Sequence, residues 1–391
     1  MFKILTLNNI SSVGLERLPR ERYEVASEIQ RPDGILLRSA NMHAMEVPAS
    51  LKAVGRAGAG VNNIPVDSLT QRGVAVFNAP GANANAVKEL VVAGMLLAAR
   101  NICQSWDFAR KLRGDGAAVH KQVEAGKKQF VGFELPGRTL GVIGLGSIGV
   151  QVANAAVALG MKVIGYDRDI TVQRAWQLSS NVQQATSVDD LLSRADFVTF
   201  HTPLTDATRN MINQERLKVL KKGVVLLNFA RDGIVEYAAL REGIESGRIH
   251  AYVCDFPHPD LMAHERVIAL PHIGASTREA EENCAVMVAD QVRDYLEHGI
   301  IHNSVNFPEV IMPRTEGYRL AVVNANVPNM VGQISTALAK AQLNILDMLN
   351  KSRGEVAYNL VDVNAPVPES TVQEIRSIQG VLAVRVLNNG D

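Results

Sequence analysis

Cysteine and long apolar runs are both scarce in this sequence. The 391 residues include only three cysteines, Cys103, Cys254 and Cys284, widely spaced and without a CxxC pair. An odd, scattered set of thiols argues against a disulfide framework and favours a reducing compartment, so we expect a cytoplasmic protein. A membrane-spanning helix needs about 18 or more consecutive apolar residues, and the sequence has no such stretch. Residues 1–10 do not resemble a secretory signal either.

An excess of charge of either sign is also missing. Lys plus Arg and Asp plus Glu each number 40, so the formal net charge is zero. A balanced chain gives no electrostatic basis for binding nucleic acid or an anionic membrane. It still permits a local cluster of cations around a small anionic substrate. Hydrophobic residues make up 47% of the chain, which is ample for sizeable cores, and the length suggests two or three domains.

Apolar segments alternate with helical patterns over most of the chain, which predicts parallel strands with crossover helices. The clearest strands of a first domain are 2–7, 34–38, 51–55 and 74–78. Residues 83–100 predict a long buried helix leading out of that domain. Six further strands fit one doubly wound sheet: 139–143, 162–166, 197–201, 224–229, 250–254 and 267–269. A helix over 278–298 then returns to the first domain.

The last part of the chain predicts a separate small domain. Residues 299–317 have the composition of a linker, and 318–391 follow a β-α-β-β-α-β order, the ferredoxin-like motif. The predicted fold class is therefore α/β, with two doubly wound parallel-sheet (Rossmann-like) domains and a C-terminal ferredoxin-like domain. The predicted boundaries are 1–98 with 282–310 for a substrate-binding domain, 99–281 for a nucleotide-binding domain, and 318–391.

The motif Gly144-Leu145-Gly146-Ser147-Ile148-Gly149 follows an apolar strand and opens a helix. Such a GxGxxG turn binds a dinucleotide pyrophosphate at the helix N-terminus, where unpaired amides and the helix dipole attract anions. Asp167 ends the next strand, 23 residues after Gly144. Its carboxylate can accept hydrogen bonds from a ribose diol and would repel a 2′-phosphate, so the sequence predicts NAD rather than NADP, although Arg168 slightly weakens that preference.

Polar side chains close several apolar strands, at the sheet edge where ligands bind in open α/β folds. Two of them suit the oxidation of a small 2-hydroxy acid: Arg231 to hold a carboxylate in a bidentate manner, and His272 to accept the hydroxyl proton. A carboxylate should orient the imidazole. Asp255, Asp260 and Glu265 remain alternatives for that role on the sequence alone.

These motifs resemble the D-isomer-specific 2-hydroxyacid dehydrogenase family over about residues 30–300. The resemblance is carried by GRAGAGVNNI from Gly55, the glycine turn, HTPL from His201, NFAR from Asn228 and PHIGAST from Pro271. Residues 318–391 are similar to an ACT domain. Family members with this domain order oxidise 3-phosphoglycerate to 3-phosphohydroxypyruvate, the first step of serine synthesis, and the resemblance implies that phosphorylated hydroxy acid as substrate. It also implies NAD as cofactor and a homodimer or homotetramer.

The resemblance assigns roles to matching positions. The catalytic residues are Arg231, Asp260 and His272. The cofactor-binding residues are Gly144, Gly146, Ser147, Ile148, Gly149, Asp167, Thr202, Phe229, Ala230, Asp255, His272, Gly274 and Ala275. The substrate-binding residues are Arg56, Ala57, Gly58, Gly60 and, from the neighbouring subunit, Lys127. Regulation by L-serine would involve Asn324, Asn326 and Asn344.

The sequence departs from the family pattern at three positions. Asp260 stands 29 residues after Arg231, where the family usually has Glu, so its carboxylate is one methylene shorter. Asp232 replaces a common Gly beside the arginine, and Asn329 replaces the usual Gly after Pro328.

Three other functions compete with that expectation. The first is oxidation of a different D-2-hydroxy acid, and the second is non-catalytic sensing of NAD, against which the Arg231/His272 pair argues. The third is a metal enzyme using His258, His264 and His272, but their spacing matches no metal-ligand pattern, so we expect no metal.

Overall fold

The computed structural model describes residues 1–314 and 317–387. Residues 315–316 of the predicted linker and 388–391 of the predicted C-terminal domain lie outside the described residues. The chain divides into two compact units: the first contains Met1–Asn83 and everything from Arg278 onward, and the second is Ala84–Thr277. The α/β fold class is confirmed, with two parallel sheets and one antiparallel sheet. The three-domain division stays a prediction.

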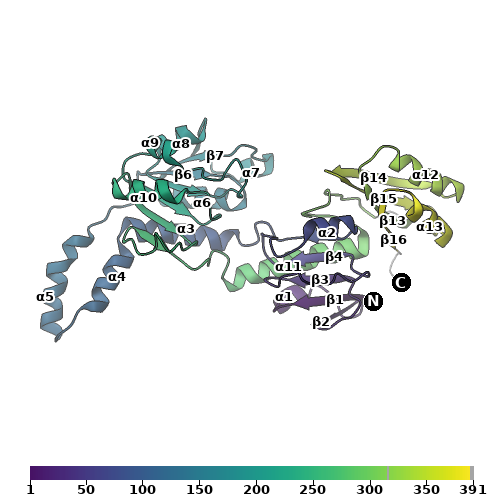
Figure 1. The fold of residues 1–391 in the computed structure, drawn as a ribbon, viewed down its shortest axis with the longest axis horizontal. Coiled ribbons are helices and arrows are strands. Elements are labelled where there is room, and N and C mark those ends of the chain that lie inside the picture. Colours follow the sequence, from purple (N-terminus) through teal and green to yellow (C-terminus); the bar gives the residue numbers. More distant parts are fainter. Residues whose placement is uncertain (315–316, 388–391) are drawn as a thin grey trace. The chain divides into compact units, whose positions relative to one another are not determined.

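The first unit begins with a five-stranded parallel sheet in the order β2-β1-β3-β4-β5 (Figure 1). Its elements are β1 (Phe2–Leu7), α1 (Ser12–Leu15), β2 (Tyr23–Ala26), β3 (Gly34–Leu37), β4 (Ala53–Arg56), α2 (Val66–Gln71) and β5 (Ala75–Phe77). Side chains alternate between two cores: Leu36 faces α11 (Arg278–His298), and Leu37 faces Leu69 of α2. The sequence did not predict β2, because this edge strand is short and mostly half-exposed.

The second unit is built on a seven-stranded parallel sheet in the order β12-β11-β10-β9-β6-β7-β8. Its strands are β6 (Thr139–Ile143), β7 (Lys162–Tyr166), β8 (Val182–Gln184), β9 (Phe197–Phe200), β10 (Val224–Asn228), β11 (Ile249–Cys254) and β12 (Val267–Ala269). The six predicted strands are present. Strand β8 was missed, because two of its three residues are exposed glutamines.

Helices cover both faces of this second sheet. They are α3 (Ala84–Ala99), α4 (Ile102–Lys111), α5 (Gly116–Gly126), the 3₁₀ helix η1 (Lys127–Phe130), α6 (Ser147–Ala158), α7 (Val172–Gln177), α8 (Val188–Arg194), α9 (Gln214–Val219) and α10 (Tyr237–Glu245). Helices α3 and α6 share one core with the sheet, and α8, α9 and α10 share the other. Helices α4 and α5 have no buried residue and extend from the unit as a hairpin (Figure 1).

The C-terminal segment folds as a four-stranded antiparallel sheet in the order β14-β15-β13-β16, the predicted ferredoxin-like arrangement. Its elements are β13 (Tyr318–Ala325), α12 (Met330–Lys340), β14 (Ile345–Arg353), β15 (Val356–Val363), α13 (Glu369–Ser377) and β16 (Val381–Leu387). Helices α12 and α13 pack on one face. The other face joins the core around α11 through residues such as Tyr358 and Leu360.

A buried ion pair anchors this sheet to the preceding segment. Arg319 is fully buried and donates to both carboxylate oxygens of Asp362 at 2.7 Å. It also donates to the carbonyl oxygens of His298, Met312 and Pro313. The guanidinium thus satisfies backbone acceptors at the end of α11 and in the linker.

Two kinds of feature are missing from the described ranges. Within residues 1–314 and 317–387, no helix combines the length and apolar character needed to cross a membrane. In the same ranges, no group of three or more His, Cys, Asp or Glu side chains is arranged to hold a metal ion.

Candidate active site

The three glycines of the turn between β6 and α6 occupy different steric environments. Gly144 has a φ of +93°, and a Cβ there would lie 2.6 Å from the His201 carbonyl oxygen. A Cβ on Gly149 would lie 1.9 Å from the Gly144 carbonyl oxygen, so helix and strand can approach closely only with glycine there. A Cβ on Gly146 would meet nothing within 4 Å. Gly146 therefore leaves open space at the N-terminus of α6, where an anion would bind.

The acidic residue after β7 lies directly against this turn. One carboxylate oxygen of Asp167 accepts from the Leu145 amide at 2.6 Å, and the other accepts from the Asp169 amide at 2.8 Å. The structure adds a residue that the sequence did not single out: Arg174 donates to the Ser147 hydroxyl at 2.6 Å. Nothing in the sequence marks Arg174, because only the packing of α7 brings it to the turn.

Buried polar atoms without partners gather at the carboxyl ends of the strands. Within the described residues they include Nδ1 of His201, Oγ1 of Thr202 and Oδ1 of Asp255. Burial lowers the pKa of His201 to about 3, so its ring is neutral, and its Nε2 lies 3.0 Å from Oγ1 of Thr199. Buried polar groups normally find hydrogen-bond partners. These orphaned atoms fit the binding of a polar cofactor along this edge.

Arg231, Asp255 and His272 lie close together at this edge. The buried Asp255 accepts the His272 amide with its carbonyl oxygen at 3.0 Å and the Gly274 amide with its carboxylate at 3.3 Å. Burial raises the pKa of Asp255, while the neighbouring His272 ring, the Gly274 amide and the Arg231 guanidinium act in the opposite direction. His272 has a φ of +50°, uncommon outside glycine, and Phe256 packs edge-on against its ring at 5.0 Å.

Asn228, the last residue of β10, anchors the loop that follows this strand. Its buried amide donates to the Arg231 carbonyl oxygen at 3.0 Å and to the Tyr252 hydroxyl at 3.3 Å. The exposed Arg231 guanidinium bonds its own loop at the Ala230 carbonyl oxygen, at 2.7 Å. Asp232, which replaces the common glycine, accepts from the Tyr237 hydroxyl.

The other two carboxylates proposed to orient His272 have different surroundings. Asp260 is 64% exposed, and its ion-pair partners among the described residues are Arg241 at 3.7 Å and His258 at 4.0 Å. Glu265 is 77% exposed and lies 3.8 Å from Arg266. Neither makes a hydrogen bond to His272 within the described chain, whereas Asp255 lies next to that histidine.

The predicted substrate residues are divided between the two units. Arg56 ends β4 in the first unit, donates to the Arg38 carbonyl oxygen at 3.1 Å, and lies against Gly58. Ala57 and Gly60 follow in the same loop. Lys127, in the second unit, begins η1 at the end of the α4–α5 hairpin and pairs with Glu124 at 2.5 Å.

Comparison with known proteins identifies the family of this chain. Residues 92–274 match the family model described as D-isomer specific 2-hydroxyacid dehydrogenase, NAD binding domain. A D-3-phosphoglycerate dehydrogenase of Haemophilus influenzae is 34% identical over 355 residues, covering 88% of this chain and 83% of that protein. The chain belongs to the D-isomer specific 2-hydroxyacid dehydrogenase family. Its second unit accordingly contains a NAD-binding domain of that family, as the glycine turn predicted.

Some relatives are longer than this chain. The D-3-phosphoglycerate dehydrogenase of Methanocaldococcus jannaschii is 36% identical over 349 residues, 87% of this chain but 63% of that protein. The chain thus spans less than two thirds of this relative's length. The NAD⁺-bound 3-phosphoglycerate dehydrogenase structure from Entamoeba histolytica has a TM-score of 0.61 and 26% identity, covering 78% of this chain and 98% of that one.

Proposed function

We propose that this protein uses NAD to oxidise D-3-phosphoglycerate to 3-phosphohydroxypyruvate. The proposal depends on one observation: Arg231, Asp255 and His272 gather at the carboxyl edge of the sheet that also carries the glycine turn. Family membership and the names of the relatives support the substrate class.

The residues divide the chemistry between them. Arg231 would hold the substrate carboxylate, because its planar fork matches two oxygens at once. His272 would accept the hydroxyl proton, since an imidazole changes charge near neutral pH. Bound NAD would supply the hydride acceptor. The sharp turn at residue 272 and the Phe256 ring restrict the orientation of the imidazole.

Arg56 and the loop 57–60 would supply further substrate contacts from the first unit. A phosphorylated acid needs two anion sites, and Arg56 would provide the second of them. Its main-chain hydrogen bond to Arg38 restrains the guanidinium before substrate binds.

Turnover of matched substrates tests the proposal. We expect NADH to form with D-3-phosphoglycerate and much more slowly with D-glycerate or D-lactate, which lack the phosphate. Arg231→Lys should lower kcat/KM about 100-fold because a bidentate contact is lost, whereas Arg194→Lys, at an exposed position of α8, should not. Equal rates for the three acids would indicate another 2-hydroxy acid. Tight NAD binding without any turnover would indicate a NAD sensor.

The carboxylate that orients His272 needs a separate test. Asp260 matches the family position, but Asp255 is the one that lies beside the histidine. We expect Asp260→Asn to shift the acid limb of the pH–rate profile if the loop closes on substrate. If only Asp255→Asn shifts that limb, Asp260 has no catalytic role.

We further propose that the active unit is a homo-oligomer. The α4–α5 hairpin has no buried residue, and Trp106 on α4 is 59% exposed, which is unusual for a monomer surface. A second copy covering the hairpin would bury Trp106 and bring Lys127 to the neighbouring substrate. Trp106→Glu should convert the oligomer to monomers in analytical ultracentrifugation, and Lys127→Ala should raise KM for the phosphorylated substrate. A monomeric wild-type protein would refute both.

Regulation by L-serine at the C-terminal domain is the remaining proposal, and resemblance supports it. Asn324 is buried and bonded to Asn359 at 2.6 Å and to the Ala325 carbonyl oxygen, and Asn326 donates to the Gly354 carbonyl oxygen. The Asn344 amide donates to the Asn364 side chain at 2.8 Å. Serine would have to displace some of these bonds. Initial rates that do not change at millimolar serine would remove the proposal.

A further inference from the structure

The first unit contains a groove lined by an unusual number of cationic side chains. Its volume is about 630 Å³. We call it the cationic groove, after the charged residues in its lining: Lys3, Arg31, Lys52, Arg72, Arg376 and Arg385, with Asp33 as the acidic member. Since acidic and basic residues are equally numerous in the whole chain, this six-to-one ratio is a strong local excess.

The cationic groove lies at the opposite edge of the first sheet from the proposed substrate loop. Lys52 directly precedes β4, and Arg72 precedes β5, so both stand at the amino ends of parallel strands. Arg56 and the loop 57–60 follow the carboxyl end of β4. The groove is therefore separate from the predicted substrate residues of this unit.

Much of the positive charge in the groove is not neutralised by the protein. Asp33 pairs with Lys52 at 2.5 Å, and Lys3 lies 3.6 Å from Glu24. Arg31, Arg72 and Arg376 are exposed and have no carboxylate partner within residues 1–314 and 317–387. Three guanidinium groups facing one cavity repel each other unless an anion lies among them.

The two walls of the groove approach each other closely. One wall is the first sheet, and the other is β16 with the end of α13. They touch at Gly73, where an added Cβ would lie 2.7 Å from the Ala383 Cβ. Arg385 donates to the Tyr295 carbonyl oxygen at 2.8 Å and stacks 4.1 Å from the centre of that ring. Preorganised walls reduce the entropic cost of binding a ligand.

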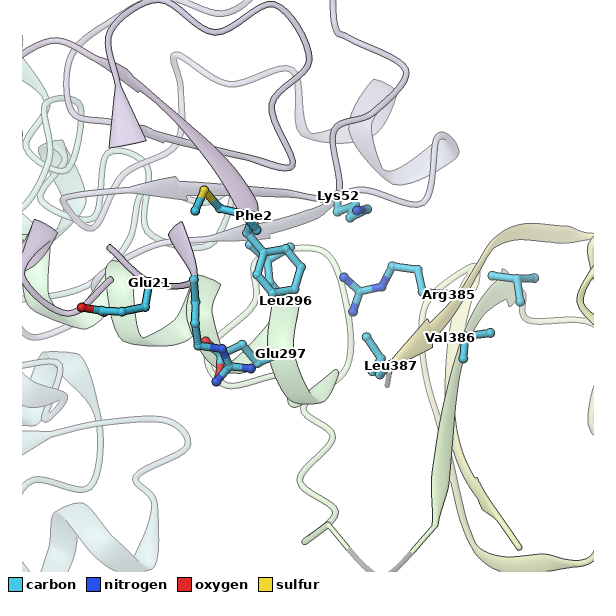
Figure 2. A pocket seen from close by; sticks show the side chains of 11 residues that line it. Phe2, Glu21, Lys52, Leu296, Glu297, Arg385, Val386 and Leu387 are labelled. Carbon is cyan, nitrogen blue, oxygen red and sulfur yellow. The ribbon is translucent and has the colours of Figure 1, made fainter. Parts of the chain in front are cut away.

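An adjoining pocket of about 540 Å³ shares Lys52 and Arg385 with the cationic groove. Figure 2 shows Arg385 reaching from β16 toward the side chains of Phe2 and Leu296. This pocket contains two acidic residues, Glu21 and Glu297, and Arg22 pairs with Glu297 at 2.8 Å, so its positive charge is largely balanced. The excess of positive charge therefore belongs to the cationic groove.

We propose that the cationic groove binds a small polyanion that carries two or more phosphate groups. Its volume is within the range of small-molecule sites. Arginine binds phosphate oxygens through paired N–H donors, so Arg72 and Arg376 can each hold one phosphate. Because these two arginines belong to opposite walls, the ligand would also tie the C-terminal domain to the first sheet.

Calorimetric titration of the full chain tests this site without using catalysis. Inorganic tripolyphosphate should bind at least about tenfold more tightly than inorganic monophosphate, because it can reach both walls. The double variant Arg72→Ala/Arg376→Ala should weaken tripolyphosphate binding about tenfold or more. The matched control is Lys222→Ala, an exposed cation of the second unit, which should leave binding unchanged.

Further measurements identify the class of ligand and show whether the proposed site is wrong. A sugar bisphosphate is titrated in parallel with tripolyphosphate. The polyanion that binds more tightly indicates whether the ligand is organic or inorganic. Thermal unfolding checks that the double variant still folds, and Arg72→Lys/Arg376→Lys, which keeps both charges, should recover part of the affinity. Binding that is equally tight in Arg72→Ala/Arg376→Ala, or absent from the wild type, overturns the proposal. Because the measured quantity is binding, these outcomes do not depend on whether phosphoglycerate is oxidised.

Discussion

Replacing Gly146 with alanine should separate cofactor binding from folding. Its backbone, with φ −72° and ψ −162°, is allowed for alanine, and the new Cβ would meet no atom within 4 Å. Losing glycine at the N-cap costs a few tenths to about 1 kcal/mol. The reduced freedom of the unfolded chain returns about 0.4–1 kcal/mol. The free energy of unfolding should therefore change by less than about 1 kcal/mol.

The same methyl group should nevertheless weaken NAD binding. It would occupy the open space beside the Ser147 and Ile148 amides, where the pyrophosphate would approach. One hydrogen bond to a charged ligand contributes about 1.5–3 kcal/mol. Losing one such bond corresponds to an increase in Kd of about 10- to 100-fold.

Gly149→Ala provides the opposite case. Its Cβ would lie 1.9 Å from the Gly144 carbonyl oxygen, a backbone atom that cannot turn away. The expected destabilisation is about 3 kcal/mol or more, at the upper end of overpacking costs.

Two measurements on each variant check this reasoning: thermal unfolding without NAD, and calorimetric titration with NAD. Gly116→Ala is the control, because its Cβ also meets nothing within 4 Å and it also lies at a helix N-terminus, that of α5. It should change neither quantity by much. If Gly146→Ala binds NAD as tightly as the wild type, the pyrophosphate does not bind beside residue 146. If it is destabilised as strongly as Gly149→Ala, the space beside residue 146 is not open.

Two further predictions concern stability. Burial lowers the pKa of His201 to about 3 from 6.5, so the unfolded chain binds a proton that the folded chain excludes. Stability should fall as the pH drops below about 6.5, by at most about 2 kcal/mol at pH 5, and His201→Gln should remove this loss in urea unfolding. Arg319→Met should cost about 3–5 kcal/mol because it removes the buried partner of Asp362. Adding Asp362→Leu should recover much of that cost, and a double variant no more stable than the single one would contradict this account.

The sheets could be predicted where their strands are apolar. The central strands β6, β9 and β10 are continuous buried segments, and their pattern is visible without any structure. The edge strands β2 and β8 have no such pattern. Each pairs with only one neighbouring strand and has little apolar surface. The α4–α5 hairpin was also missed, and its helices bury no side chain among the described residues.

The sequence alone determined the glycine turn, its acidic partner Asp167 and the strand ends that carry Arg231 and His272, because each depends on spacing within one strand–turn–helix segment. The tertiary structure decided which carboxylate lies beside His272 and that Arg174 reaches Ser147. It also decided that Arg72, which follows α2, and Arg376 of α13, about 300 residues apart, line one groove. Those juxtapositions arise from how loops and helices pack, and packing joins residues whose separation along the chain carries no local signal.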